Sequence, residues 1–194
     1  MPPKGKLPEG AIRDFEQWVK LGAPDPRRAD GAKPGPSAEI DTEAGRLESA
    51  RVHLDAALAV ARAMKDRRLQ SEALNGLGNL AWYLDRKPEA REHFEAGLSL
   101  AREAGHRLLE GNLLGNLGGL YFDEGNKDQA RSYNQAALTL AREIGDRKLE
   151  GNTLSNLGMA NQVHGLLDEA LVQLLASLAV ARDLGYVRLE CVVL

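Results

Sequence analysis

Asparagines that could take part in molecular recognition recur at a fixed spacing of 40 residues. Asn112 recurs as Asn152, and Asn116 recurs as Asn156. A side-chain amide both donates and accepts hydrogen bonds, so it can pair with the backbone of a bound peptide. If the two pairs lie on one surface, their side chains would form amide ladders, that is, rows of amide groups along that surface. The alternative is that some of these asparagines bond to a neighbouring helix and only hold the repeat spacing, because buried polar groups are usually satisfied locally.

Four arginines share the same 40-residue step, and these are Arg62, Arg102, Arg142 and Arg182. Such a ladder could bind acidic ligands. Near the end of a helix, however, arginine more often complements the helix dipole and pairs with nearby acids, here Glu110 and Glu150. We therefore favour a structural role for the arginines.

The residue types that support metal binding or catalysis are sparse. His53 and His93 are one period apart, but packed helices lie about 8–10 Å from each other and no third ligand is evident. Cys191 is the single cysteine and has no nearby base. Nucleophile elbows, phosphate loops and paired-histidine metal helices are missing from the sequence. We expect no catalytic residues, no metal and no cofactor.

Composition narrows the protein class. Hydrophobic residues make up 43% of the chain and aromatic residues only 5%, which predicts a core of leucine and alanine between closely packed helices. The net charge of −3 argues against nucleic-acid binding. No apolar run is long enough to span a membrane. The first residues, M-P-P-K-G-K-L-P, lack the apolar region of a signal peptide, so we expect a cytoplasmic protein.

A repeated unit positions these residues. The segment 107–118 returns as 147–158, with nine of the twelve positions identical, and this period predicts a solenoid of helix pairs. In the best-formed unit we expect helix A over residues 147–163 and helix B over residues 167–184. Glycines at the helix ends predict left-handed C-terminal caps: Gly105, Gly125, Gly145, Gly165 and Gly185. Asn126 with Gln129, and Asp146, are the predicted N-terminal caps.

The apolar pattern resembles the tetratricopeptide repeat, in a 40-residue form with lengthened helices. In the middle unit the signature positions are Leu114, Leu117, Gly118, Tyr121, Gly125, Ala130 and Ala137. Asn134 stands where an aromatic residue is usual, so we expect it to be satisfied locally or partly exposed. The resemblance implies an all-α fold, a right-handed α-solenoid of antiparallel helix pairs with about three and a half repeats. Residues 45–70 form the half repeat, 71–110, 111–150 and 151–190 the full repeats, and 191–194 the start of a truncated helix.

The resemblance also implies a function. In this family the A helices line a concave groove that holds a peptide, so we predict a non-catalytic protein–protein interaction scaffold. Carried over by position, the predicted groove residues are Asn75, Asn79, Tyr83, Asn112, Asn116, Phe122, Asn152, Asn156 and Gln162, with Glu72 and Asp123 beside them. The lysines and arginines of the family's carboxylate clamp are missing at the matching positions. We therefore expect a protein or peptide ligand, but not one held by its C-terminal carboxylate.

The N-terminal part differs in composition from the repeats. Residues 1–27 resemble the C-terminal tail of the cytochrome c domain common in planctomycete proteins, with a short helix predicted over 11–21. Met1 would correspond to the haem ligand, but no C-x-x-C-H motif is present to attach haem. The alternative function is therefore a fragment of a larger periplasmic cytochrome-bearing protein whose repeats form a docking arm. Residues 28–44 read as a flexible linker, in which Pro34 and Pro36 exclude a helix.

The C-terminal end is apolar where a terminal repeat usually presents a polar outer face. Its last residues are Cys191, Val192, Val193 and Leu194. This end predicts a missing continuation, a partner surface, or self-association through the open C-terminal face.

Overall fold

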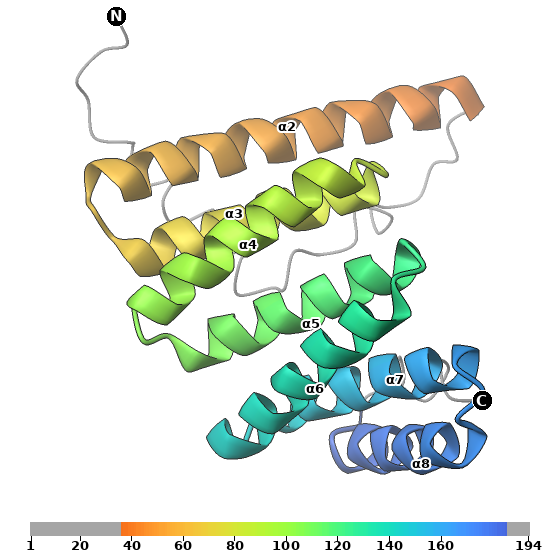
Figure 1. Cartoon of the computed structure of the whole chain (residues 1–194). Helices are drawn as coiled ribbons and strands as arrows, with labels where there is room; N and C mark the ends of the chain where they lie inside the picture. Colours follow the sequence, from red (N-terminus) through yellow and green to blue (C-terminus); the bar gives the residue numbers. More distant parts are fainter. Residues whose placement is uncertain (1–35, 186–194) are drawn as a thin grey trace, which may run out of the picture. The chain divides into compact units, whose positions relative to one another are not determined.

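The computed structural model describes residues 36–185 of the chain, and side chains from residue 45 onward. Every element in this range is an α-helix (Figure 1), which confirms the all-α prediction. The helices are α2 (Pro36–Ala63), α3 (Arg67–Tyr83), α4 (Lys87–Glu103), α5 (Arg107–Asp123), α6 (Lys127–Ile144), α7 (Arg147–Val163) and α8 (Leu167–Asp183). The predictions for residues 1–27 and 191–194 lie outside the described residues and stay predictions.

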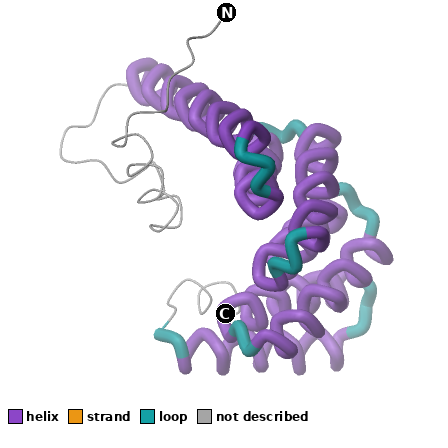
Figure 2. Tube along the Cα trace, turned by 90° about the vertical axis from the view of Figure 1, so that its left-hand side faces the viewer, coloured by secondary structure: helices purple, strands orange, loops and turns teal. Residues whose placement is uncertain are grey.

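Three helix pairs, α3–α4, α5–α6 and α7–α8, follow one another along the chain. Short loops connect successive helices (Figure 2), so neighbouring helices run antiparallel. With α2 before the first pair, this arrangement confirms the prediction of about three and a half repeats.

Helix α2 begins earlier than the sequence predicts. The chain divides into two compact units, residues 1–49 and 50–194, and α2 starts in the first and ends in the second. Residues 36–44, assigned above to the linker, are helical, so the expectation that Pro36 excludes a helix is wrong. Proline fits the first position of a helix, because the N–H that it lacks would have no partner there and its fixed φ already suits the helix.

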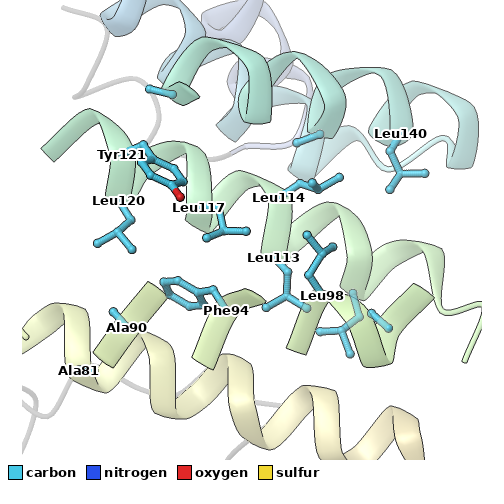
Figure 3. Packing of buried hydrophobic residues seen from close by; sticks show 14 residues of the cluster. Ala81, Ala90, Phe94, Leu98, Leu113, Leu114, Leu117, Leu120, Tyr121 and Leu140 are labelled. Carbon is cyan, nitrogen blue, oxygen red and sulfur yellow. The ribbon is translucent and has the colours of Figure 1, made fainter. Parts of the chain in front are cut away.

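The core of the repeats consists mainly of leucine and alanine, as the composition predicts. Figure 3 shows Phe94 of α4 beside Leu113 and Leu117 of α5, within one cluster of buried residues. The recurring glycine of each A helix lies at the tightest contact in its pair. A Cβ placed on Gly118 would lie 2.4 Å from the Nδ2 atom of Asn134.

Asn134 is the polar residue at an aromatic position of the repeat signature. Its side chain is 1% exposed, and its Nδ2 donates to the carbonyl oxygen of Ala130 at 2.9 Å. The Oδ1 atom has no partner among the described residues. The expectation that Asn134 is hydrogen-bonded locally is therefore met for its NH2 group. The expectation that Asn134 is partly exposed is wrong.

The helix ends follow the predicted chemistry. The five predicted cap glycines all have positive φ, between 65° and 77°. The side chain of Asp146 accepts from the N–H of Leu149 at 2.7 Å, and the side chain of Asn126 accepts from the N–H of Gln129 at 3.4 Å. These caps confirm the predicted boundaries of α6 and α7.

The A helices form one layer of the repeat array. Helix α3 contacts α5, and α5 contacts α7, whereas among α3–α8 no contact joins α4 to α6 or α6 to α8. The A helices are therefore packed closer together than the B helices. We call the exposed side of α3, α5 and α7 the A-helix face.

Candidate functional site

The nine predicted groove residues all lie on α3, α5 or α7, and none of them is fully buried. Five are exposed: Asn79, Tyr83, Asn112, Asn152 and Gln162. Four are half-buried: Asn75, Asn116, Phe122 and Asn156. Their side chains therefore divide into groups that are held by the protein and groups that are open to a ligand.

The asparagines between α3 and α5 are held by one another. The Nδ2 of Asn116 donates to the Oδ1 of Asn75 at 2.8 Å and to the Oδ1 of Asn79 at 3.2 Å. These bonds join the A helices of two successive repeats. For these three residues the alternative stated above, that asparagine holds the repeat spacing, is confirmed.

The same position one repeat later is different. Asn156 occupies the place of Asn116, but the residues 40 positions after Asn75 and Asn79 are Gly115 and Gly119. A glycine offers no side-chain acceptor, and within residues 45–185 the structure shows no hydrogen bond to the side chain of Asn156. The ladder that the sequence predicts therefore does not continue from α5 to α7.

Two further asparagines lie on the same two helices. Asn112 on α5 and Asn152 on α7 are exposed, and neither side chain has a hydrogen-bond partner in the described part of the chain. Gly115 itself is buried, although a Cβ placed on it would meet nothing within 4 Å. We call Asn112, Gly115, Asn152 and Asn156 the α5–α7 patch. It carries three side-chain amides on two A helices that contact each other.

An aromatic contact lies at the other end of α3. The Nε1 of Trp82 donates to Asp123 Oδ2 at 2.8 Å, and the ring covers Gly119, where a Cβ would lie 2.6 Å from its Cη2 atom. Trp82 therefore links α3 to α5. Trp82 is not among the predicted groove residues, although it stands 40 residues before Phe122, which is one of them.

Charged side chains near the repeats are largely paired. Arg102 contacts Glu110 at 2.9 Å and Arg142 contacts Glu150 at 3.0 Å, which confirms the favoured structural role for these two arginines. Glu72, beside the predicted groove, pairs with Arg68 at 2.7 Å. The A-helix face therefore offers mainly neutral hydrogen-bonding groups.

Within the described residues, no three histidine, cysteine or acidic side chains come together as metal ligands. His53 is exposed, and His93 lies 3.9 Å from Glu89. None of the helices in the described range is long and apolar enough to cross a membrane.

Solved structures with a similar fold include repeat proteins of different kinds. BtubC from P. vanneervenii has a TM-score of 0.67 at 20% identity, over 90% of this chain and 72% of that one. Aspartyl phosphate phosphatase F from Bacillus subtilis has a TM-score of 0.63 at 16% identity, over 90% of this chain and 51% of that one. The N-terminal domain of stress-induced protein-1 from C. elegans has a TM-score of 0.52 at 22% identity, over 66% of this chain and 97% of that one.

At these identities the similarity shows the fold alone. A search of curated proteins found no significant match. The comparison with protein families is more decisive, because the tetratricopeptide repeat matches residues 36–103 and 109–183. These ranges cover α2 and all three helix pairs. The chain therefore belongs to the tetratricopeptide repeat family.

Proposed function

We propose that this chain is a non-catalytic scaffold that binds a peptide segment of a partner protein at the α5–α7 patch. Tetratricopeptide repeats suggest a protein-interaction scaffold, and the fold is generally non-catalytic. The observation that carries the proposal is the set of open amides at the patch. Asn112, Asn152 and Asn156 have no hydrogen-bond partner among residues 45–185, whereas Asn116 has two.

The chemistry of the patch suits a peptide backbone. Each free amide can accept from a backbone N–H and donate to a backbone carbonyl. Gly115 is itself buried and adds no side chain beside these amides. Because the patch itself carries no charged side chain, the ligand is an internal peptide segment rather than a charged terminus.

The aromatic end of the face supplies a second type of contact. Tyr83 is 61% exposed. Trp82 precedes it in the sequence, Phe122 stands at the position of Trp82 one repeat later, and both are half-buried. Aromatic rings at a binding surface bury apolar side chains and add a polar group for hydrogen bonding. We expect a ligand that combines an extended polar stretch with at least one large apolar residue.

Peptide selection tests this proposal. A displayed random-peptide library is selected on the wild-type chain, and the affinities of the selected peptides are measured by calorimetry. The variant Asn112→Ala/Asn152→Ala/Asn156→Ala should bind at least about 10-fold more weakly, because each lost hydrogen bond costs roughly 0.5–1.5 kcal/mol.

The control variant changes polar residues on the outside of α6. Ser132→Ala/Gln135→Ala removes two exposed side chains of α6 that lie outside the α5–α7 patch, and it should bind like the wild type. Equal binding by the triple asparagine variant, or weakened binding by the control alone, would contradict the proposal.

A further inference from the structure

The two junctions between A helices also differ at the C-terminal ends of these helices. At the first junction, α3–α5, the Nε1 of Trp82 donates to Asp123 Oδ2 at 2.8 Å, and the ring of Trp82 covers Gly119. One repeat later the residues at these three positions are apolar: Phe122, Val163 and Met159. A phenyl ring has no N–H to donate and a valine side chain has no oxygen to accept, so this hydrogen bond has no counterpart at the second junction. We call Phe122, Met159 and Val163 the apolar end.

The apolar end continues the α5–α7 patch along one side of α7. Asn152, Asn156, Met159 and Val163 follow one another at intervals of four, three and four residues, which places them on one side of a helix. Asn152 is exposed, Val163 is 49% exposed, and the other two are half-buried. The row is about 16 Å long at the rise of an α-helix, a length that about five residues of an extended peptide cover. One short segment can therefore contact the amides and the apolar end together.

A lysine lies at the end of α7 in each of the two junctions' equivalent places, but its charge is paired only at the first. The Nζ of Lys87 donates to the carbonyl oxygen of Asp123 at 3.2 Å and lies 3.5 Å from the Oδ1 of Asp85. The Nζ of Lys127 donates to the carbonyl oxygen of Val163 at 3.2 Å. The residue 40 positions after Asp85 is Gly125, and among residues 45–185 no carboxylate pairs with Lys127.

The first junction therefore supplies two carboxylates that the second lacks. Asp123 accepts from Trp82 and Asp85 pairs with Lys87, whereas their counterparts are a valine and a glycine. An ammonium group has three N–H donors, so Lys127 keeps donors for a further acceptor after its bond to the carbonyl group. An open apolar surface beside an unpaired positive charge suits a ligand that brings an apolar side chain and a carboxylate.

We propose that the peptide bound at the α5–α7 patch places a large apolar side chain on the apolar end and the carboxylate of a neighbouring Asp or Glu on Lys127. This inference rests on the proposed function, because it specifies two residues of the peptide that the patch binds. Methionine is flexible and adapts to different apolar shapes, so Met159 lets the site take leucine, methionine or phenylalanine. The acidic residue is the more selective requirement, since the amides of the patch carry no charge.

The peptides selected on the wild-type chain give the first test. Their sequences should share a large apolar residue next to an acidic one. Two altered peptides are then made from a selected sequence, one with the apolar residue changed to alanine and one with the acid changed to its amide.

Two chain variants address the two contacts. Phe122→Trp/Met159→Gly/Val163→Asp copies the first junction, and it should bind the selected peptide at least about 10-fold more weakly, because the apolar side chain loses its contact surface. Lys127→Gln keeps an N–H donor but removes the charge. It should weaken binding about 3-fold, since an exposed ion pair contributes little, and the difference should vanish at high salt.

The altered peptides and a matched lysine are the controls. The alanine peptide should bind the first variant and the wild type equally, and the amide peptide should do the same with Lys127→Gln. Lys87→Gln changes the equivalent lysine of the first junction, whose ammonium lies beside Asp85, and it should bind like the wild type. Circular dichroism and thermal melting establish that each variant is folded.

The contradicting results separate this inference from the proposed function. Equal binding by the Asn112→Ala/Asn152→Ala/Asn156→Ala variant contradicts the proposed function itself. Weakened binding by that variant, together with wild-type binding by both new variants, overturns this inference alone. The same holds if the variants weaken the altered peptides as much as the selected one. Loss of binding when the peptide's C-terminus is amidated would assign Lys127 to a chain end, and would overturn the role of an internal acid.

Discussion

The two junctions between A helices, α3–α5 and α5–α7, use the same asparagine position for different purposes. At the first junction, Asn116 bonds to Asn75 and Asn79 and ties two repeats together. At the second, Gly115 and Gly119 stand at the repeat positions of Asn75 and Asn79, and they offer Asn156 no side-chain acceptor. The role of a residue in this array is therefore decided by its partner one repeat earlier, and not by its own repeat position.

This difference locates the candidate site. Where the acceptors are present, asparagine stabilises the solenoid, because a satisfied network rigidifies the contact. Where glycine replaces the acceptors, the amide stays accessible and the surface opens. A break in the repeat pattern thus marks the place where a ligand can supply the missing hydrogen bonds.

The largest expected effect compares the two glycines of α5. Gly119→Ala places a methyl group against the ring of Trp82, whose Cη2 atom would lie 2.6 Å away, so we expect a loss of about 1–2 kcal/mol in unfolding free energy. Gly115→Ala meets open space and should gain about 0.5–1 kcal/mol, because alanine favours a helix. Urea denaturation measures both, and changes of the same sign would contradict the described packing.

The next effect compares the two asparagines. Asn116→Ala removes two hydrogen bonds between repeats, whereas Asn156→Ala removes none among residues 45–185. Both substitutions raise helix propensity by the same amount. The difference between the unfolding free energies of the two variants therefore measures the hydrogen bonds of Asn116. We expect Asn116→Ala to be less stable than Asn156→Ala by about 1–2 kcal/mol. Equal denaturation midpoints would show that the network contributes nothing.

The smallest effect comes from rebuilding the missing acceptor. Gly115→Asn restores at the second junction the residue that Asn75 supplies at the first, so it should hold Asn156 and add about 0.5 kcal/mol beyond Gly115→Ala. It should also weaken binding of a selected peptide, since the amide is then occupied. Calorimetry on both variants checks this, and undiminished binding by Gly115→Asn would argue against a ligand role for Asn156.

Much of the fold could be predicted because it is local and periodic. The 40-residue step, the cap glycines and the capping side chain of Asp146 place the three helix pairs correctly. The start of α2 could not be predicted in the same way, because proline breaks a helix in its interior but fits the first helical position, where Pro36 lies.

The site could be predicted only in part. Sequence pattern places all nine groove residues on the A helices, but it cannot tell an amide that is bonded within the chain from one that is open. That distinction depends on contacts between helices about 40 residues apart, such as Asn116 with Asn75. Comparing each asparagine with the residue 41 positions earlier would have supplied the signal, since Asn156 then falls opposite Gly115.

The most direct test of the central claim is an NMR titration of the side-chain amides with a selected peptide. Signals of Asn112, Asn116, Asn152 and Asn156 can be assigned with the single alanine variants. We expect the amide signals of Asn112, Asn152 and Asn156 to shift on binding, while that of Asn116 stays in place. Shifts confined to Asn116, or none on the A-helix face at all, would contradict it.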